Sequence, residues 1–313
     1  MKQSITTLCL NPALDVTYHV HKLIADQKAR TDSARYDPGG NGINIGRALN
    51  RMEIDSTTFC IIAGEVGQIL KSLIEPQLSH VVYEEVTGQT RINSTIIELD
   101  THTQYQLAGS GTPIAESQLQ NIIADFIEKT ANGYGIITGS CQPNIAKTQY
   151  ADLVRQINDN GGRAVVDTHG EMLKHAIDAG PFLIKPNQYE LETLMHVKLN
   201  SHEAIAHAAR QIQQQGVAHV CVSLGHEGAI LVSPNNSFYA RSLDVPVNTT
   251  VGAGDSMVAG LVAGFSLYDE PQQALRYGMA CGAGTVMHPG TELFNGEQLA
   301  DFRSRVNIER LGI

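Results

Sequence analysis

The residues best suited to chemistry lie in a glycine-rich stretch, residues 249–257, with the sequence TTVGAGDSM. The apolar pattern that follows predicts a helix, so Gly252, Ala253 and Gly254 lie at a helix start. The first turn of a helix has unpaired N–H groups and the positive end of the helix dipole, and it therefore attracts anions. Asp255 falls in that turn, where a carboxylate either caps the helix or accepts a proton from a hydroxyl beside a bound phosphate. Alone, the stretch favours the simpler interpretation, a glycine-rich turn with an Asp cap.

A second glycine-rich stretch, residues 37–47, has the sequence DPGGNGINIGR and precedes a helix that the apolar periodicity starts near Asn41. Its Gly40 and Gly42 allow close backbone approach to a ligand, and Asn44 offers an amide to a sugar hydroxyl. The glycine spacing is similar to a dinucleotide-binding fingerprint. That fingerprint should follow the first buried strand directly, whereas this stretch lies about 30 residues later, so the similarity is poor.

Three cations are candidates for binding an anion. Lys28 and Arg30 alternate along a polar segment, so on an extended chain their side chains point the same way. Arg91 opens a later predicted strand. A solvated basic edge explains the first two cations equally well. His19 and His21 can share a strand face, but two residues do not make a metal site.

Composition limits the possible functions. The 313 residues are 42% hydrophobic and 17% charged, enough for one large α/β domain or a large domain with a small addition. The formal net charge is −10 without a basic tract, which argues against binding to nucleic acid or to a membrane surface. The five cysteines are odd in number and include no Cys-x-x-Cys pair, which predicts reduced thiols and a cytoplasmic location. We find no signal-peptide core and no apolar run of ~20 residues, and so expect no membrane span.

Short strands are predicted in the first third of the chain. They cover residues 5–10, 15–21, 57–62, 81–86, 90–98 and 104–107. The last two form an antiparallel pair across a polar turn, with apolar residues on both faces. Such a small sheet would expose apolar surface unless something covers it.

From residue 115 onward, helices and strands alternate. The predicted helices cover 117–129, 148–158, 171–179, 190–196 and 202–214, and the strands cover 134–138, 164–167, 182–184 and 217–223. Two antiparallel strands, 229–233 and 237–240, and three helices, 258–267, 271–286 and 297–306, follow. The alternation indicates βαβ units and a mostly parallel sheet with helices on both faces.

Ligands of such sheets bind beyond the carboxyl ends of the strands. Ser140, Asp167, Asn187, residues 223–225 and the turn before Asp255 all fall at such ends. Their shared placement favours a catalytic site over an isolated helix cap.

Four motifs, in this order, resemble the PfkB group of ribokinase-like sugar kinases. They are residues 39–44 (GGNGIN), 185–190 (KPNQYE), 222–225 (VSLG) and 251–257 (VGAGDSM). The resemblance covers essentially the whole chain. It implies one ribokinase-like domain over residues 1–313, an α/β/α sandwich with a mostly parallel central sheet and a small β-sheet lid. The lid would comprise about 14–36 and 87–107, and the lids of two subunits would pack together in a homodimer.

The resemblance also implies a reaction, in-line transfer of the ATP γ-phosphoryl group to a sugar hydroxyl with Mg²⁺. Asp255 would be the base, and the N–H groups of Gly252, Ala253 and Gly254 would form the anion hole. Within the group, the chain is most similar to the minor bacterial 6-phosphofructokinase, which predicts phosphorylation of fructose 6-phosphate at O1.

Different parts of the chain resemble enzymes that act on different sugar phosphates. The Lys28 and Arg30 pair and residues 38–40 resemble the 6-phosphofructokinase, whereas residues 11–13 and 90–93 also resemble 1-phosphofructokinase. Both 1-phosphofructokinase and tagatose-6-phosphate kinase therefore stay open as alternatives.

By the same resemblance, two sets of residues would bind the substrates. Those for the sugar phosphate are Asp15, Lys28, Arg30, Gly39, Gly40, Asn44, Arg91 and Ser140. Those for the nucleotide are Lys185, Asn187, Ser223, Gly225, Gly228, Thr250, Gly254 and His288. Asn187 and Glu190 would orient waters on Mg²⁺, the alternative being a helix cap with a surface acid. Tyr189 and residues 288–292 depart from the family pattern, which leaves adenine contacts and a K⁺ site open.

Two other classes of function are compatible with parts of the sequence. One is a dinucleotide-dependent oxidoreductase, which would change absorbance with NAD(H). The other is a non-catalytic sugar-phosphate sensor on the same fold, which would release no ADP. An intact Asp255, together with both glycine-rich loops, argues against the sensor.

Overall fold

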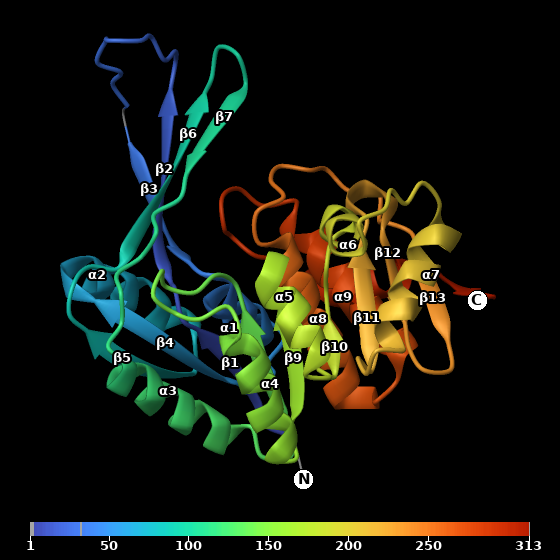
Figure 1. The fold of residues 1–313 in the computed structure, drawn as a ribbon. Coiled ribbons are helices and arrows are strands. Elements are labelled where there is room, and N and C mark those ends of the chain that lie inside the picture. Colours follow the sequence, from blue (N-terminus) through green and yellow to red (C-terminus); the bar gives the residue numbers. More distant parts are fainter. Residues whose placement is uncertain (1–2, 32, 313) are drawn as a thin grey trace.

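The computed structural model describes residues 3–31 and 33–312, which form two β-sheets, one of them enclosed between helices (Figure 1). The larger sheet has ten strands. Their order is β14 (Ile308–Leu311), β13 (Ser237–Ala240), β12 (Ala229–Val232), β11 (His219–Ser223), β10 (Leu183–Ile184), β9 (Arg163–Asp167), β8 (Tyr134–Thr138), β1 (Ile5–Cys9), β4 (Thr57–Ala63) and β5 (His80–Val86). The strands from β11 to β5 are parallel, and β12, β13 and β14 are antiparallel.

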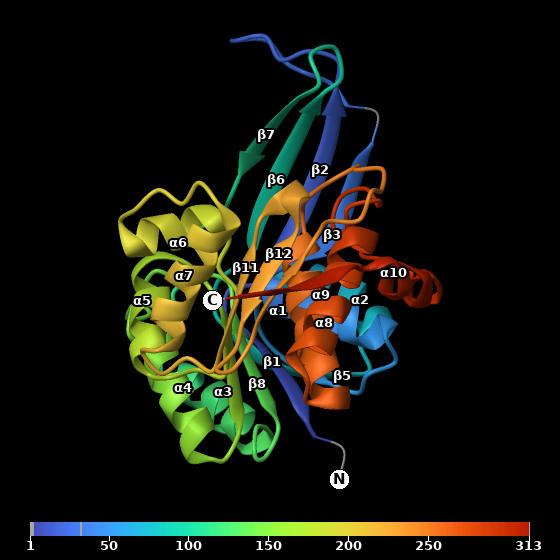
Figure 2. The ribbon, with the colours of Figure 1, turned by 90° about the vertical axis from the view of Figure 1, so that its right-hand side faces the viewer.

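Helices cover both faces of this sheet (Figure 2). One layer contains α3 (Glu116–Lys129), α4 (Gln149–Asp159), α5 (Gly170–Asp178), α6 (Gln188–Met195) and α7 (His202–Gln213). The other contains α1 (Asn41–Arg51), α2 (Gly64–Ile74), α8 (Ala253–Tyr268), α9 (Pro271–Thr285) and α10 (Leu299–Arg305). Short 3₁₀ turns occur at η1 (Glu75–Gln77), η2 (Gly225–Glu227) and η3 (Gly296–Gln298). The central strands β1 and β8 are buried along their whole length, as expected for parallel strands covered on both faces.

Helix α8 has eleven consecutive buried residues, from Asp255 to Phe265. It packs against α9 so closely that a side chain at Gly260 would lie 2.5 Å from the carbonyl oxygen of Tyr277. Gly264 meets Ala274 in the same way. Only glycine permits this approach, and the close contact gives the first turn of α8 a rigid support.

The second sheet has four strands and projects from the core (Figure 1). Its order is β3 (Ala34–Gly39), β2 (Ala13–Val20), β6 (Arg91–Glu98) and β7 (Thr103–Leu107). Ala13 lies opposite both Gly39 and Arg91 at the end nearest the core. The β2–β3 connection lies at the far end. Large apolar side chains are exposed on the sheet and its connections: Ile24, Tyr36, Ile92, Leu99, Tyr105 and Leu107.

The structure confirms the α/β prediction, the helix starting at Asn41 and the antiparallel pairing of β6 with β7. It also pairs β2 with β6 in parallel, a pairing for which no prediction was made from the sequence. Three elements were not predicted, namely α2, the edge strand β14, and β3, whose sequence contains Pro38. No helix among the described residues is both long and apolar enough to cross a membrane.

Candidate active site

Two helices begin beside each other at the candidate site. Helix α1 starts after Gly40 (φ 116°) and α8 after Gly252 (φ 76°), and the two helices are in contact. Both glycines have a positive φ that other residues rarely adopt, so each tight turn depends on glycine. The unpaired N–H groups of the two first turns make this region attractive to anions.

Asp255 lies in the first turn of α8 and is hydrogen-bonded to both asparagines in the first turn of α1. Asn41 Nδ2 donates to Asp255 Oδ1 at 2.7 Å, and Asn44 Nδ2 donates to Oδ2 at 2.9 Å. The Asp255 residue is only 6% exposed. Burial, with the charge of Asp167, raises the pKa of Asp255 to about 7, although the two amides and Lys185 oppose the rise. A carboxylate with this pKa is suited to accept a proton near neutral pH.

A buried cation lies close to the turn that precedes Asp255. Lys185 Nζ is 3.3 Å from Asp167 Oδ1, and the two residues follow β10 and end β9. Burial opposes the charged form of Lys185, but Asp167 and Glu190 hold its pKa above the ordinary lysine value. The Nζ atom is 3.5 Å from the position that a Cβ of Gly254 would take. Lys185 therefore adds positive charge beside the anion-attracting turn.

A cleft of about 330 Å³ lies between the four-stranded sheet and the core, within the usual ~300–1,000 Å³ of small-molecule sites. Asp15, Arg35, Asp37 and Asn93 line it from the sheet, and Thr249, Val251, Gly290 and Thr291 from the core. Asn93 Nδ2 donates to Asp15 Oδ1 at 2.8 Å, and burial raises the pKa of Asp15 above its usual value. A side chain at Gly39 would overlap the Asp15 carboxylate, which explains the glycine there.

The three predicted phosphate-binding cations do not lie together within one chain. Arg91 is at the core end of the sheet, where its Nε and Nη1 donate to the carbonyl oxygens of Asn11 and Gly109 at 3.1 and 3.0 Å. Lys28 and Arg30 are exposed in the β2–β3 connection at the far end (Figure 1). The alternation of Lys28 and Arg30 was visible in the sequence, but the length of β2 and β3 was not.

Asn187 and Glu190 form a capping box at the start of α6. Asn187 Oδ1 accepts from the Glu190 N–H, and Glu190 Oε2 accepts from the Asn187 N–H, both at 2.8 Å. The described residues contain no group of three or more His, Cys, Asp or Glu side chains that could hold a metal ion alone. This is compatible with Mg²⁺, which keeps several waters and binds largely through substrate phosphates.

The remaining predicted nucleotide residues surround the same edge of the sheet. Ser223 ends β11 and bridges to Asn187. Gly225 has open space where a side chain would be, whereas a side chain at Gly228 would overlap the Ala240 carbonyl oxygen. Gly228 is thus explained by strand packing. On the sugar side, the Ser140 hydroxyl accepts a hydrogen bond from Asn11 Nδ2 at 3.2 Å.

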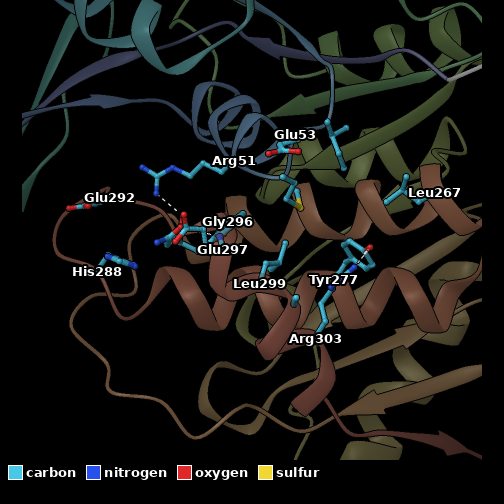
Figure 3. A pocket seen from close by; sticks show the side chains of 15 residues that line it. Arg51, Glu53, Leu267, Tyr277, His288, Glu292, Gly296, Glu297, Leu299 and Arg303 are labelled. Carbon is cyan, nitrogen blue, oxygen red and sulfur yellow. Dashed lines mark hydrogen bonds between the residues drawn. The ribbon is translucent and has the colours of Figure 1, made fainter.

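A larger cavity, about 760 Å³, lies outside this site (Figure 3). Its walls come from the end of α1, from α8 to α10 and from the segment before α10, and they include His288 and Arg51. Neither Asp15 nor Asp255 lines it. His288, predicted from the sequence as a nucleotide residue, therefore lies on a different cavity from the cleft beside Asp15. Thr250 is exposed in the segment before Gly252.

Sequence reasoning missed two residues of the site, Asn41 and Arg47. Asn41 is three positions before Asn44, a spacing that places both on one helix face. That signal was available. Arg47 is also three positions from Asn44, but nothing in the sequence indicates that its guanidinium is buried. The glycine spacing similar to a dinucleotide fingerprint has another explanation, since a side chain at Gly46 would overlap Thr58 of β4.

Known proteins of one family match this chain over nearly its whole length. The model of the pfkB family carbohydrate kinases matches residues 9–296. The 1-phosphofructokinase of Bacillus subtilis (strain 168) is 29% identical over 301 residues, which span 96% of this chain and 98% of that protein. The ATP-dependent 6-phosphofructokinase isozyme 2 of Escherichia coli (strain K12) is 30% identical over 291 residues, 92% of this chain and 94% of that one. The crystal structure of Escherichia coli phosphofructokinase-2 in complex with potassium superposes with a TM-score of 0.91 at 28% identity, covering 96% and 98% of the two chains.

Proposed function

The chain belongs to the pfkB family of carbohydrate kinases, and on that premise we propose that it phosphorylates fructose 6-phosphate at O1, using ATP. The supporting observation is the position of Asp255, a buried carboxylate with a raised pKa between the glycine-started first turns of α1 and α8. Phosphoryl transfer needs positioning and charge stabilisation more than covalent chemistry, and this arrangement offers both.

In the proposed reaction, the sugar hydroxyl oxygen attacks the γ-phosphorus of ATP, and the bond from that phosphorus to the β–γ bridging oxygen breaks. Asp255 takes the proton of the hydroxyl. The N–H groups of Gly252, Ala253 and Gly254 hold the transferring group. Lys185 adds a positive charge, and its attraction for the phosphoryl group is stronger in a buried site than in water. Each Asp255 oxygen accepts one amide hydrogen bond, so the hydroxyl approaches a carboxylate that is already held in place on both oxygens.

On the sugar side, Asp15, Gly39, Gly40, Asn44 and Ser140 are assigned to the hydroxyl groups. Asp15 lines the cleft and Asn44 is hydrogen-bonded to Asp255, which supports the roles of these two residues.

Arg91, at the core end of the four-stranded sheet, is assigned to the phosphate already on the sugar, because a guanidinium suits bidentate phosphate contacts. Lys28 and Arg30 are at the opposite end of the sheet. We assign them to the same phosphate only when two copies pair through these sheets, so that the far end of one sheet overlies the core end of the other.

On the nucleotide side, Ser223, Gly225, Gly228, Thr250 and Gly254 are assigned to ATP. Asn187 and Glu190 would orient waters around Mg²⁺, which supplies charge neutralisation of the phosphates when bound. The potassium complex of Escherichia coli phosphofructokinase-2 supports a K⁺ requirement for this chain. His288 is left out of the ATP contacts because it lines the other cavity.

Relatives of nearly equal similarity are named for different sugar phosphates. The two curated relatives, at 29% and 30% identity, are a 1-phosphofructokinase and a 6-phosphofructokinase. Lys28, Arg30 and residues 38–40 support the 6-phosphate, whereas residues 11–13 and 90–93 support the 1-phosphate as second candidate.

The experiment is ADP release, measured as kcat/KM for fructose 6-phosphate, fructose 1-phosphate and tagatose 6-phosphate. We expect fructose 6-phosphate to be preferred. A preference of tenfold or more, about 1.4 kcal/mol, for either rival would replace the assigned sugar. Absence of ADP release with any carbohydrate would refute the kinase itself.

The four-stranded sheet is proposed to act as a lid over the cleft and as the pairing surface of a homodimer. Six large apolar side chains are exposed on it or on its connections, among them Leu107 at 60% and Tyr36 at 52%. A second copy packed on this sheet would cover them.

A further inference from the structure

The two amides on Asp255 are not equivalent. Asn44 is 5% exposed and its hydrogen bond to Asp255 is buried, whereas Asn41 and its bond are only partly buried. The carbonyl oxygen of Asn44 accepts from Arg47 Nη1 at 3.1 Å. Among the described residues, the Asn41 carbonyl oxygen accepts no hydrogen bond. It lies against Gly139, directly before Ser140, which we assign to the sugar.

Arg47 is itself an unusual residue, since its guanidinium is buried and has no carboxylate partner among residues 3–31 and 33–312. It is 3% exposed and donates to three neutral oxygens, on Gln77, Asn44 and Thr291, at 2.8, 3.1 and 3.1 Å. Burial lowers the pKa of Arg47 to about 10, so it is still protonated near neutral pH. A buried cation among neutral acceptors is costly unless its hydrogen bonds are well formed.

The guanidinium fixes which way the Asn44 amide points. If the amide rotated by half a turn, its NH₂ group would face the Arg47 donors and its carbonyl oxygen would face the Asp255 carboxylate. Both contacts would be repulsive, because arginine has donors only and an ionised carboxylate has acceptors only. Arg47 thereby keeps the Asn44 NH₂ group directed at Asp255.

We propose that Arg47 is a positioning residue that holds Asn44 as a permanent donor to Asp255, and that Asn41 is the donor displaced by the reacting hydroxyl. This inference rests on the proposed role of Asp255 as base. Of the two carboxylate oxygens, Oδ1 would then receive the proton, while Oδ2 stays bonded to Asn44 throughout the reaction. The charged groups facing Asp255 from other elements, Asp167 and Lys185, are common to both states.

The two roles predict different pH profiles. The acid limb of kcat/KM reports the free enzyme, and that of kcat reports the substrate complex. A hydrogen bond to an ionised carboxylate favours its charged form, so losing one raises its pKa. Asn41→Ala should raise the acid limb of kcat/KM and leave that of kcat unchanged, because the hydroxyl has already replaced Asn41 in the complex. Arg47→Gln, which releases Asn44 in both states, should raise both limbs, by roughly one pH unit.

The chain offers a matched control in Arg51, one turn further along α1. Arg51 donates to the carbonyl oxygens of Leu293 and Phe294 and so ties α1 to the same segment that Arg47 reaches through Thr291, without contacting Asn44. Arg51→Gln removes that tie and should move neither limb. Arg47→Lys keeps the charge and one donor, and it should recover part of the shift. The sugar phosphate titrates equally for all variants, so differences between variants report the protein.

The inference is overturned if Arg47→Gln moves the limbs no more than Arg51→Gln, or if Asn41→Ala moves both. Asn41 is partly exposed and its replacement should fold, so the second outcome can be read even if Arg47→Gln does not fold. The Asp255→Asn variant separates this test from that of the function. If it keeps most of its kcat, the base assignment fails. If Asp255→Asn is inactive while the acid limbs of Arg47→Gln and Asn41→Ala match those of the parent, the base assignment stands. Only the roles of Arg47 and Asn41 are then refuted.

Discussion

At the scale of single residues, the central feature of the site is Asp255, a carboxyl group whose ionisation is disfavoured by its surroundings. Asp255 is buried beside another acid, Asp167, and only two amides and Lys185 favour its charged form. The folded protein therefore disfavours the ionised form of Asp255, whereas it would favour that of an exposed capping aspartate. Such a conflict between local stability and sequence is expected at functional sites.

This conflict should appear in stability. Because burial raises the pKa of Asp255 from its ordinary 3.8 to about 7, the folded protein holds this proton more tightly than the unfolded chain does. The stability of the parent should therefore fall as pH rises from about 4 to 7, by at most about 4 kcal/mol from this group. Asp255→Asn lacks this titration. We expect its unfolding free energy, relative to the parent, to rise by at least about 1 kcal/mol between pH 5 and 8.

Chemical denaturation of both proteins at each pH measures this difference. Asp125→Asn is a suitable control, since Asp125 is exposed on α3 and forms no ion pair with another described residue. Parallel stability curves for Asp255→Asn and the parent would show that Asp255 is ionised without penalty.

At the scale of elements, helix starts carry the site. Helices α1 and α8 begin at positive-φ glycines, and α6 begins with the Asn187–Glu190 capping box. The capping box uses the side chains of both Asn187 and Glu190. Whether Glu190 also serves Mg²⁺ is a separate, testable matter.

Glu190→Gln isolates the metal role, because glutamine at this position also completes a capping box. We expect the variant to fold normally, to need more Mg²⁺ for half-maximal activity and to have a lower kcat. Titration of activity with Mg²⁺ at fixed ATP measures this. Glu192→Gln, two residues along α6, should leave the titration unchanged. An unchanged titration for Glu190→Gln would reduce Glu190 to its capping role.

Much of this arrangement was predictable from the sequence, and the rest was not for identifiable reasons. The periods of apolar residues located most strands and helices, and the two glycine-rich turns marked α1 and α8. Helix α2 was not predicted because Gly64 and Gly67 weaken the helical pattern of its sequence. The hydrogen bond from Asn41 to Asp255 joins residues 214 positions apart, and only tertiary packing brings them together. The separation of Arg91 from Lys28 likewise depends on the β2–β6 register.

At the scale of the whole molecule, the four-stranded sheet projects from the core (Figure 1). Large apolar side chains on this sheet and its connections are exposed. Patches of this kind mark interaction surfaces. The cleft lies between this sheet and the core, and the sheet carries Arg91 at its core end and Lys28 and Arg30 at its far end. The pairing surface and the proposed sugar site are therefore on the same sheet.

We therefore expect a homodimer that depends on this sheet. Leu107→Glu, which places a charge on the β7 residue that is 60% exposed, should shift the protein to monomer at assay concentration. Ile69→Glu, at a site 47% exposed on α2, should not. Light scattering with each protein distinguishes the states. A parent protein that is monomeric and fully active would contradict pairing through the sheet.

The most direct test of the account is the turnover of Asp255→Asn with its preferred sugar phosphate, alongside its affinity for ATP. Asparagine keeps the size of the side chain and one acceptor but cannot take the proton of the hydroxyl. We predict that kcat falls by about two orders of magnitude or more, while the dissociation constant for Mg-ATP changes little. A variant that retains most of its kcat would contradict the role of Asp255 as base.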